Sequence, residues 1–193
     1  MGIEYELKYR ASEAALEAIR QAFPGQTQLF SMQTTYYDTP SGALSARWYT
    51  LRLRMENEVS VCTLKAPAPG IGRGEWELPC DSIEAAIPEL CKLGAPNDLP
   101  ALAAEGLIRV CGARFQRTAI TLPLPEATVE LALDLGTLHG GSRQIPLCEV
   151  EVELKAGKPE ACAAFGGMLA AKFGLQPETK SKFRRALALY KGE

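Results

Sequence analysis

Apolar and charged residues alternate without interruption from Ile3 to Tyr9, in the order Ile-Glu-Tyr-Glu-Leu-Lys-Tyr. Because the side chains of a β-strand point alternately to its two faces, this period of two predicts a strand. Glu4, Glu6 and Lys8 share one face, and the apolar residues share the other. Neighbours on one face stand about 6.6 Å apart, so two carboxylates and one ammonium group could converge on a single bound ion or ligand.

Similar strand patterns recur along the chain and are separated by short turns, which is typical of an antiparallel meander. The predicted strands cover residues 29–38, 48–54, 59–65, 75–78, 107–111, 114–122, 128–135 and 147–155. Apolar residues at helical spacing predict helices over residues 12–23 with Ser12 as N-cap, over 81–93 with a capping box of Asp81 and Glu84, and over 159–173 before Gly174. The basic segment 180–185 is compatible with a strand or a helix.

The polar faces of these strands carry charged residues almost exclusively, whereas a face that meets solvent normally mixes Thr, Ser, Lys and Gln. The alternating charged residues are Glu4, Glu6, Lys8, Arg52, Arg54, Glu75, Glu77, Glu130, Asp134, Glu149, Glu151, Glu153 and Lys155. The helices need an apolar surface to cover, and the apolar faces of the strands supply it. We therefore expect an α+β fold in which an eight-stranded antiparallel β-barrel forms a tunnel with a charged interior and helices packed outside. An open sheet whose charged side faces solvent is the alternative.

The composition limits the classes of protein to consider. A chain of 193 residues suits one domain, so we expect residues 1–193 to form a single domain. The 21 basic and 23 acidic residues give no general attraction to nucleic acid or to a membrane. Six cysteines without a CxxC pair and a single histidine indicate reduced thiols rather than a zinc site or a disulfide framework. The chain starts directly with a strand pattern and has no apolar run as long as a signal or membrane segment, so we expect a cytoplasmic protein.

A tunnel with a charged interior needs a ligand that carries both signs of charge. Two like charges about 4 Å apart repel by about 4 kcal/mol near a protein surface, so clustered Arg and Lys residues need an anion and clustered carboxylates need cations. A polyphosphate chelated by a divalent metal meets both needs. Carboxylate oxygens suit Mg²⁺ or Mn²⁺, and arginines offer forked donors to phosphate. The expected partner is therefore a small triphosphate, not nucleic acid or a membrane.

The order of the motifs resembles that of the CYTH family, the triphosphate tunnel metalloenzymes. Glu4-x-Glu6-x-Lys8 is similar to the family signature, although it is a short motif by itself. The further matches, in order, are Tyr36-Tyr37-Asp38-Thr39-Pro40, Leu51-Arg52-Leu53-Arg54, Thr63-Leu64-Lys65, Gln116-Arg117-Thr118, Val129-Glu130 to Asp134-Leu135-Gly136, Glu149-Val150-Glu151-Val152-Glu153-Leu154, and Ser181-Lys182 with Arg185. Together they span the whole chain, which makes the ordered set specific.

The resemblance implies roles for individual residues. The triphosphate ligands that it implies are Lys8, Arg52, Arg54, Lys65, Arg117, Lys182 and Arg185. The implied ligands of Mg²⁺ or Mn²⁺ are Glu4, Glu6, Glu151 and Glu153, and the implied catalytic residues are Lys8, Glu4 and Glu6. Residues that either bind metal or only line the wall are Glu75, Glu77, Glu130, Asp134 and Glu149.

Within the family the chain most resembles bacterial inorganic triphosphatases. Many of these carry a further histidine-rich helical domain, which the 193 residues lack. The resemblance implies a hydrolase that acts on phosphoanhydride bonds and cleaves tripolyphosphate to diphosphate and phosphate. Lys8 would then position the attacking water or accept its proton.

Two other classes of function stay open. Adenylate cyclases and thiamine triphosphatases share the fold, and either would need an aromatic platform for its organic group. By parity Trp48 shares the face of Arg52 and Arg54, whereas Trp76 points outward. Tyr36-Tyr37 stands where such cyclases commonly show His-Phe, which counts against a cyclase. The other class is a polyphosphate-binding module without activity, which would need only the cations and not the acidic rows. The sequence does not determine the oligomeric state or the preferred metal.

Overall fold

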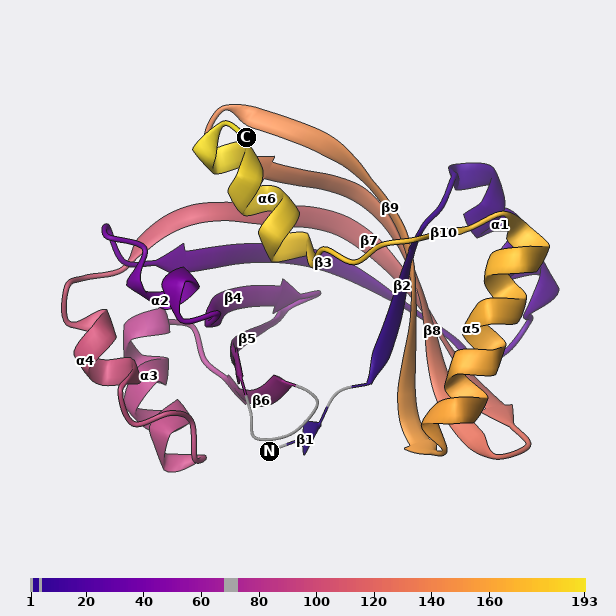
Figure 1. Cartoon of the computed structure of the whole chain (residues 1–193), viewed down its shortest axis with the longest axis horizontal. Coiled ribbons are helices and arrows are strands. Elements are labelled where there is room, and N and C mark those ends of the chain that lie inside the picture. Colours follow the sequence, from indigo (N-terminus) through magenta and orange to yellow (C-terminus); the bar gives the residue numbers. More distant parts are fainter. Residues whose placement is uncertain (1, 4, 68–72) are drawn as a thin grey trace.

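The predicted strands pair into one antiparallel sheet with the order β1-β6-β5-β4-β3-β7-β8-β9-β2-β10 (Figure 1). The computed structural model describes residues 2–3, 5–67 and 73–193. The strands are β1 (Gly2–Ile3), β2 (Glu6–Arg10), β3 (Thr27–Asp38), β4 (Thr50–Glu56), β5 (Val59–Pro67), β6 (Arg73–Pro79), β7 (Ile108–Leu124), β8 (Ala127–Gly140), β9 (Arg143–Gly157) and β10 (Gln176–Pro177). Among these described strands eight have five residues or more, which confirms the predicted eight-stranded sheet.

The first two strands join the two ends of this sheet. β1 pairs with β6 at one end, whereas β2 pairs with β9 and β10 at the other. Ile3 and Glu6 are three positions apart in the chain and therefore at most about 11 Å apart in space. The sheet must curl around an interior to bring its ends this close, as the predicted tunnel requires. No ladder pairs β2 directly with β6 among the described residues.

The outward faces of β2, β8 and β9 are apolar and are covered by α1 (Glu13–Ala22) and α5 (Pro159–Phe173). Ser12 begins α1 by accepting a hydrogen bond from a backbone N–H, and Gly174 ends α5 in the left-handed conformation, with φ 65°. Large buried side chains of this core are Leu16, Ile19, Leu131, Phe165 and Leu169. Both helices therefore begin and end where the sequence predicts.

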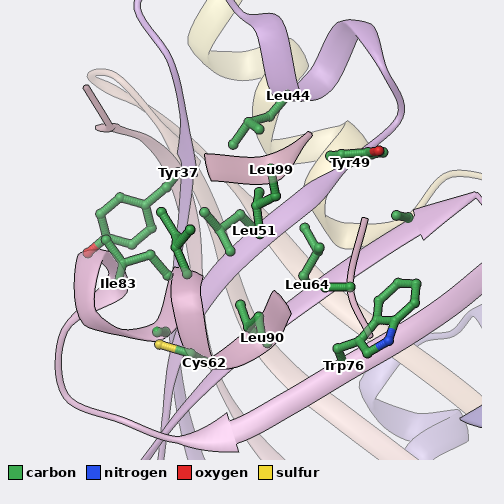
Figure 2. Packing of buried hydrophobic residues seen from close by; sticks show 14 residues of the cluster. Tyr37, Leu44, Tyr49, Leu51, Cys62, Leu64, Trp76, Ile83, Leu90 and Leu99 are labelled. Carbon is green, nitrogen blue, oxygen red and sulfur yellow. The ribbon is translucent and has the colours of Figure 1, made fainter. Parts of the chain in front are cut away.

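Three further helices cover the outer face of β4, β5 and β6. They are α2 (Ala43–Ala46), α3 (Ile83–Lys92) and α4 (Leu99–Ala103). Figure 2 shows their shared core with the sheet, in which Leu64 and Leu90 are fully buried. Trp76 points outward into this core, as the parity of its strand predicts. None of the helices in the described ranges is long and apolar enough to span a membrane.

Two local predictions are wrong. The two segments predicted over 107–111 and 114–122 form one 17-residue strand, β7, because its ladder with β8 continues without a break from Cys111 to Leu124. Ser82 alone is the N-cap of α3, in place of the predicted capping box of Asp81 and Glu84. Neither error changes which side chains point inward.

The segment left undecided by its sequence is a helix, α6 (Lys182–Lys191), with Ser181 as N-cap. In contrast to the other helices, α6 packs beneath the arch of β7, β8 and β9, on the side that faces the interior (Figure 1). Its Phe183 ring lies 5.1 Å from that of Tyr36, measured between centroids, in a core that also contains Phe115 and Leu138. One end of the interior is therefore apolar, and the charged side chains occupy the rest.

Gly140 at the end of β8 allows α6 to approach the sheet closely. A Cβ atom at this position would collide with the carbonyl oxygen of Ala186 and lie 2.5 Å from the backbone nitrogen of Tyr190. Overpacking of this kind typically costs about 1–3 kcal/mol. We therefore expect Gly140→Ala to lower the free energy of unfolding by about that amount, as measured by equilibrium urea unfolding.

Gly167→Ala on α5 is the matched control, because nothing lies within 4 Å of the added methyl group. Alanine is favoured over glycine in a helix by up to about 1 kcal/mol, so this variant should be at least as stable as the wild type. A Gly140→Ala protein with wild-type stability would contradict the close packing of α6 on β8.

Candidate active site

The inward side chains of the barrel surround a cavity of about 360 Å³. In the described part of the chain 21 residues line it, and 15 of them are charged. The basic residues are Lys8, Arg52, Arg54, Lys65, Arg73, Arg117, Lys155 and Lys182, and the acidic residues are Glu6, Glu56, Glu75, Glu77, Glu130, Glu151 and Glu153. The charged faces predicted from the alternating pattern therefore meet in one space.

One wall of the cavity carries an acidic row, formed by Glu6, Glu130 and Glu153. Glu6 of β2 lies opposite Glu153 of β9, which in turn lies opposite Glu130 of β8. The Cβ atoms of opposed residues are about 5 Å apart, and the three side chains are 23–29% exposed, so their carboxylates are open to the cavity. Lys8 Nζ lies 2.7 Å from Glu6 Oε1, and Lys155 Nζ lies 2.8 Å from Glu153 Oε2. The row therefore combines carboxylates with ammonium groups.

A second wall, formed by β4 and β5, is basic. The buried Arg54 donates from Nε to Thr34 Oγ1 at 3.0 Å. Burial, together with the charges of Arg52 and Arg117, lowers the pKa of Arg54 to about 10. Arg52 Nε is buried and has no hydrogen-bond partner among the described residues. Buried donors without an acceptor are rare in folded proteins, so this wall is suited to receive an anion.

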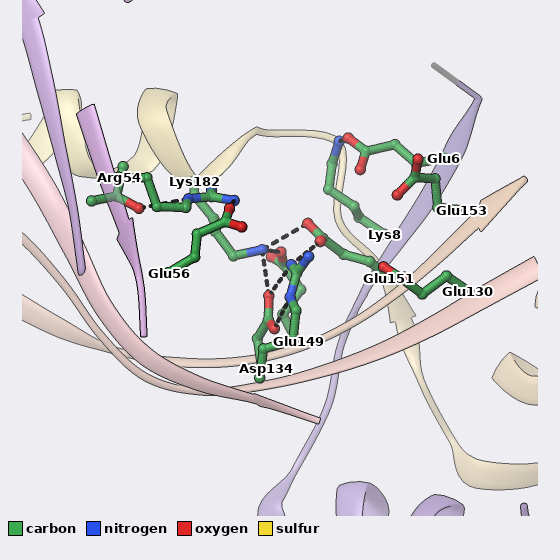
Figure 3. Close-up of polar contacts among 12 residues, drawn as sticks. Glu6, Lys8, Arg54, Glu56, Glu130, Asp134, Glu149, Glu151, Glu153 and Lys182 are labelled. Carbon is green, nitrogen blue, oxygen red and sulfur yellow. Dashed lines mark hydrogen bonds and ion pairs between the residues drawn. The ribbon is translucent and has the colours of Figure 1, made fainter. Parts of the chain in front are cut away.

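Three buried carboxylates, which we call the buried cluster, lie next to the acidic row on β8 and β9. They belong to Asp134, Glu149 and Glu151, and their oxygens lie within 4.8 Å of one another, a donor set that could hold a metal ion. Figure 3 shows Lys182 reaching from α6 into this cluster, with Nζ 2.9 Å from Asp134 Oδ2, 2.7 Å from Glu151 Oε1 and hydrogen-bonded to Glu149. Arg117 donates to Asp134 through two hydrogen bonds of 2.7 Å and also donates to Glu151. Together with Arg185, which pairs with Glu149, three cations therefore compensate the cluster.

Burial and charge act in opposite directions on the protonation of this cluster. Burial raises the pKa of Glu149 to about 7, although Lys182 and Arg185 act to lower it. Burial acts the same way on Glu151, but the charges of Lys182 and Arg117 outweigh it and hold the pKa of Glu151 well below its usual range. At Lys182 burial is outweighed by the carboxylates, which raise the pKa of the ammonium group. Lys182 is therefore a cation at neutral pH.

The structure brings together most of the predicted site residues that it describes. Those that line the cavity are Lys8, Arg52, Arg54, Lys65, Arg117, Lys182, Glu6, Glu151 and Glu153, and of the less certain residues Glu75, Glu77 and Glu130 also line it, whereas Asp134 and Glu149 are fully buried in its wall. Arg185 is not among the described residues that line the cavity, and it pairs with Glu149 and, at 3.7 Å, with Glu178. Glu4 lies outside the described residues.

The predicted ligands do not include some residues that lie near the charged groups. Lys155 belongs to the alternating charged face of β9 and lines the cavity, but it was given no role as a ligand. Arg73 begins β6 directly after the glycine-rich stretch, where no periodicity indicates its direction. The Phe115 ring lies with its centroid 5.5–6.0 Å from three cationic groups of the site, those of Arg54, Arg117 and Lys182. An aromatic face next to cations is a contact between strands that no single strand pattern shows.

The acidic row fits a hard divalent cation better than the buried cluster does. Mg²⁺ in proteins is usually bound through one or two carboxylates and shares its other positions with phosphate oxygens and water. The acidic row faces the cavity, where such ligands have room. In the buried cluster both oxygens of Glu151 accept hydrogen bonds, Oε1 from Lys182 and Oε2 from Arg117. A metal ion there would compete with two fixed cations.

Removing the ammonium group from the buried cluster should destabilise the protein. Lys182→Met keeps the length of the side chain but leaves buried carboxylates without their main counterion, which typically costs about 3–5 kcal/mol. Folding then raises the pKa of these carboxyl groups above its value in the unfolded chain. A group of this kind stabilises the fold at low pH and loses that contribution as the pH rises. The destabilisation should therefore be full at pH 8 and smaller at pH 5, as measured by urea unfolding at both values.

Lys158→Met is the matched control for this prediction. Lys158 pairs with Glu126 at the surface, where both side chains are more than half exposed, and such pairs contribute about 1 kcal/mol or less. A Lys182→Met protein that is as stable as the wild type at pH 8 would show that Lys182 is not the counterion of the cluster.

The sequence is similar to that of a curated inorganic triphosphatase from Haemophilus influenzae. The two proteins are 28% identical over 159 residues, which make up 80% of this chain and 45% of the relative. The chain therefore spans about half the length of the curated relative that it matches.

Solved structures with a similar fold include two candidate cyclases. One is a candidate adenylyl cyclase from Hippeastrum, which is described as having a dominant triphosphatase activity. Its TM-score is 0.68 at 20% identity, and the match covers 99% of this chain and 97% of the Hippeastrum chain. The other is a candidate adenylate cyclase from Bacillus halodurans, with a TM-score of 0.65 at 19% identity. The match covers 95% of this chain and 96% of the Bacillus halodurans chain. At these identities the likeness concerns the fold alone. The CYTH domain profile matches residues 2–187, which include the whole barrel and most of α6, so the chain belongs to the CYTH family.

Proposed function

We propose that the protein is a metal-dependent inorganic triphosphatase that hydrolyses tripolyphosphate to diphosphate and phosphate in the charged cavity. The observation that carries this proposal is that one cavity combines a basic wall with an open row of carboxylates. In the described part of the chain, the buried donor Arg52 Nε on the basic wall has no hydrogen-bond partner. A phosphate chain with a divalent cation matches both. The similarity to the inorganic triphosphatase of Haemophilus influenzae supports the choice of substrate.

In this proposal the basic wall binds the phosphate oxygens. Arg52 and Arg54 donate forked hydrogen bonds, and Lys65 adds a third positive charge on the neighbouring strand. The pKa of Arg54 is lowered by burial and by the charges beside it, so a bound polyanion would favour its charged form. Phosphoryl transfer needs little covalent help from a protein, so this positioning and charge compensation supply most of the catalysis.

Lys8 acts as a cation in this proposal and does not accept a proton. Burial would lower its pKa, but the carboxylates of Glu6, at 2.7 Å, and of Glu151 and Glu149 together outweigh burial and raise it above the ordinary value. A lysine that stays protonated at neutral pH cannot take the proton of the attacking water. We therefore assign Lys8 to holding and orienting phosphate oxygens beside the acidic row.

The reaction hydrolyses one phosphoanhydride bond. Water supplies the oxygen that attacks the terminal phosphorus, the bridging P–O bond breaks, and diphosphate leaves, while the proton of the water passes to the phosphate products or to solvent. Mg²⁺ or Mn²⁺ bound at the acidic row would neutralise charge on the phosphate oxygens. The resemblance adds Glu4 and Glu151 as ligands of this ion, and we retain both as proposals.

Two further features support the proposed cellular location and the proposed domain organisation. The six cysteines are free thiols, which supports the cytoplasm, since disulfides are rare in that compartment. The helix α6 near the C-terminal end packs into the barrel that begins with β1, which supports residues 1–193 as a single domain.

Replacing Glu6 should remove metal-dependent turnover without unfolding the protein. Glu6→Gln keeps the shape of the side chain but removes one negative charge from the acidic row. We expect phosphate release from tripolyphosphate to fall by roughly 100-fold in Mg²⁺ or Mn²⁺, and release by the wild type to stop when a chelator is added. Circular dichroism should show the same fold for both proteins.

The control is Glu58→Gln, which removes a carboxylate from the exposed hairpin between β4 and β5 and should leave the rate unchanged. Wild-type rates for Glu6→Gln in excess Mg²⁺ would remove Glu6 from the mechanism.

The same assay with ATP and thiamine triphosphate tests the choice of substrate. Faster turnover of either compound would support a thiamine triphosphatase or, if cyclic AMP forms, an adenylate cyclase. Tight binding of tripolyphosphate with no phosphate release in either metal would support the non-catalytic binding module.

A further inference from the structure

Lys155 lies beside the acidic row and pairs with two of its carboxylates. Its Nζ lies 2.8 Å from Glu153 Oε2 and 3.8 Å from Glu130 Oε1. These two glutamates lie opposite each other on β9 and β8, and all three side chains line the charged cavity. The ammonium group is therefore within ion-pairing distance of carboxylates that a divalent cation at the acidic row would use.

A β-bulge places Lys155 at this position. The ladder between β8 and β9 shifts its register between Thr128, which pairs with Ala156, and Val129, which pairs with Leu154. Lys155 is the extra residue, so no residue of β8 lies directly opposite it. Bulges are common next to active sites, where they change the direction of a side chain. The side chain of Lys155 is therefore not fixed by an opposing side chain on β8.

Lys155 is held less firmly than Lys8, the other lysine of the acidic row. The side chain of Lys155 is 42% exposed, against 19% for Lys8. Lys8 donates a hydrogen bond to Glu6. The charges of Glu149 and Glu151 attract Lys8 as well. Ion pairs that are open to water contribute little to stability, so a cation that enters the row displaces Lys155 more easily than Lys8.

An ammonium group and a divalent cation cannot share these carboxylates. Mg²⁺ lies about 2.1 Å from a carboxylate oxygen that binds it. An ion on Glu153 Oε2 would therefore lie within about 5 Å of Lys155 Nζ in its present position. Like charges at this distance repel each other, even near a protein surface. Lys155 must leave the pair when the metal binds, and the cavity that it already lines is the space open to it.

We propose that Lys155 competes with the divalent cation for the carboxylates of Glu130 and Glu153. A free metal ion must break this ion pair to bind. A metal ion that arrives with a phosphate chain brings oxygens that accept hydrogen bonds from the displaced ammonium group. Lys155 therefore makes the acidic row bind a metal–phosphate complex in preference to the metal alone. This inference rests on the proposed function, because it takes the acidic row as the metal site.

The test is the affinity of Lys155→Met for Mn²⁺ in the absence of any phosphate. Electron paramagnetic resonance of free Mn²⁺ gives Kd directly, without turnover. Methionine cannot compete with the metal, so we expect Kd to fall by roughly tenfold. A lysine that only oriented the carboxylates would give the opposite sign, because losing such a partner typically weakens metal binding by about 10–100-fold.

Two variants control for the change of charge. Lys155→Arg keeps a cation beside the carboxylates and should bind Mn²⁺ as weakly as the wild type. Lys172→Met removes an exposed lysine from α5, outside the barrel, and should also keep the wild-type Kd. Unchanged or weaker Mn²⁺ binding by Lys155→Met would overturn the proposal.

Chemical labelling tests the displacement in the wild-type protein, so it does not depend on a variant that folds. Acetic anhydride modifies lysine amines, and mass spectrometry of the digested protein measures the modification at each lysine. We expect Mn²⁺ to increase the acetylation of Lys155, since its amine leaves the ion pair, and to leave that of Lys172 unchanged. Equal acetylation of Lys155 with and without saturating Mn²⁺ would contradict its displacement.

The binding data separate this inference from the proposed function. Tighter Mn²⁺ binding by Lys155→Met, with no phosphate release from tripolyphosphate by the wild type, would reject the proposed hydrolysis and keep the competition. Metal-dependent phosphate release by the wild type, with equal Kd values for Mn²⁺ in the two proteins, would keep the hydrolysis and reject the competition.

Discussion

Charged side chains on the inner face of a curled sheet cannot all reach bulk water, and each must find an opposite charge inside. This constraint explains why the acidic and basic residues of the interior alternate around the wall and do not collect separately. Lys8 lies beside Glu6, Lys155 beside Glu153, and Lys182 among three carboxylates. An unpaired ion in such a place costs several kcal/mol. On the basic wall the ion pairs are longer, 3.7 Å from Arg52 to Glu75 and 3.6 Å from Arg54 to Glu56, so a bound polyanion would add to their compensation.

The same constraint determines where the hydrophobic cores lie. Since the inner face is charged, the apolar faces of the strands point outward, and α1 to α5 cover them in two separate cores. Helix α6 is the exception, because it carries both apolar and charged side chains into the interior. Phe183 and Ala186 complete an apolar core at one end of the barrel, while Lys182 compensates the buried cluster. This single helix therefore sets how much of the interior remains available to a ligand.

Strand parity predicted most of the fold and most of the cavity, because in a barrel the direction of a side chain depends only on its position within a strand. Glu6, Arg54 and Glu151 come from three different strands, and alternation alone brought them to the same side. What parity could not show are features that arise between elements. The orientation of α6, and thus the depth at which Lys182 lies, depends on packing against Gly140 and Phe115. The sequence placed Trp48 in a strand over residues 48–54, but β4 begins only at Thr50. Trp48 lies in the preceding turn with φ 62°, and a turn residue of this kind leaves no alternating signal in the sequence.

The central claim is that both walls of one cavity bind a single metal–triphosphate complex. The most direct test is a crystal structure with tripolyphosphate and Mn²⁺, with the metal located by its anomalous scattering. The account predicts an Mn²⁺ peak at the carboxylates of Glu6 and Glu153, and phosphate oxygens within hydrogen-bonding distance of Arg52 Nε and Arg54. Mn²⁺ bound by Asp134 and Glu149 in place of Lys182, or phosphate bound only outside the barrel, would contradict it.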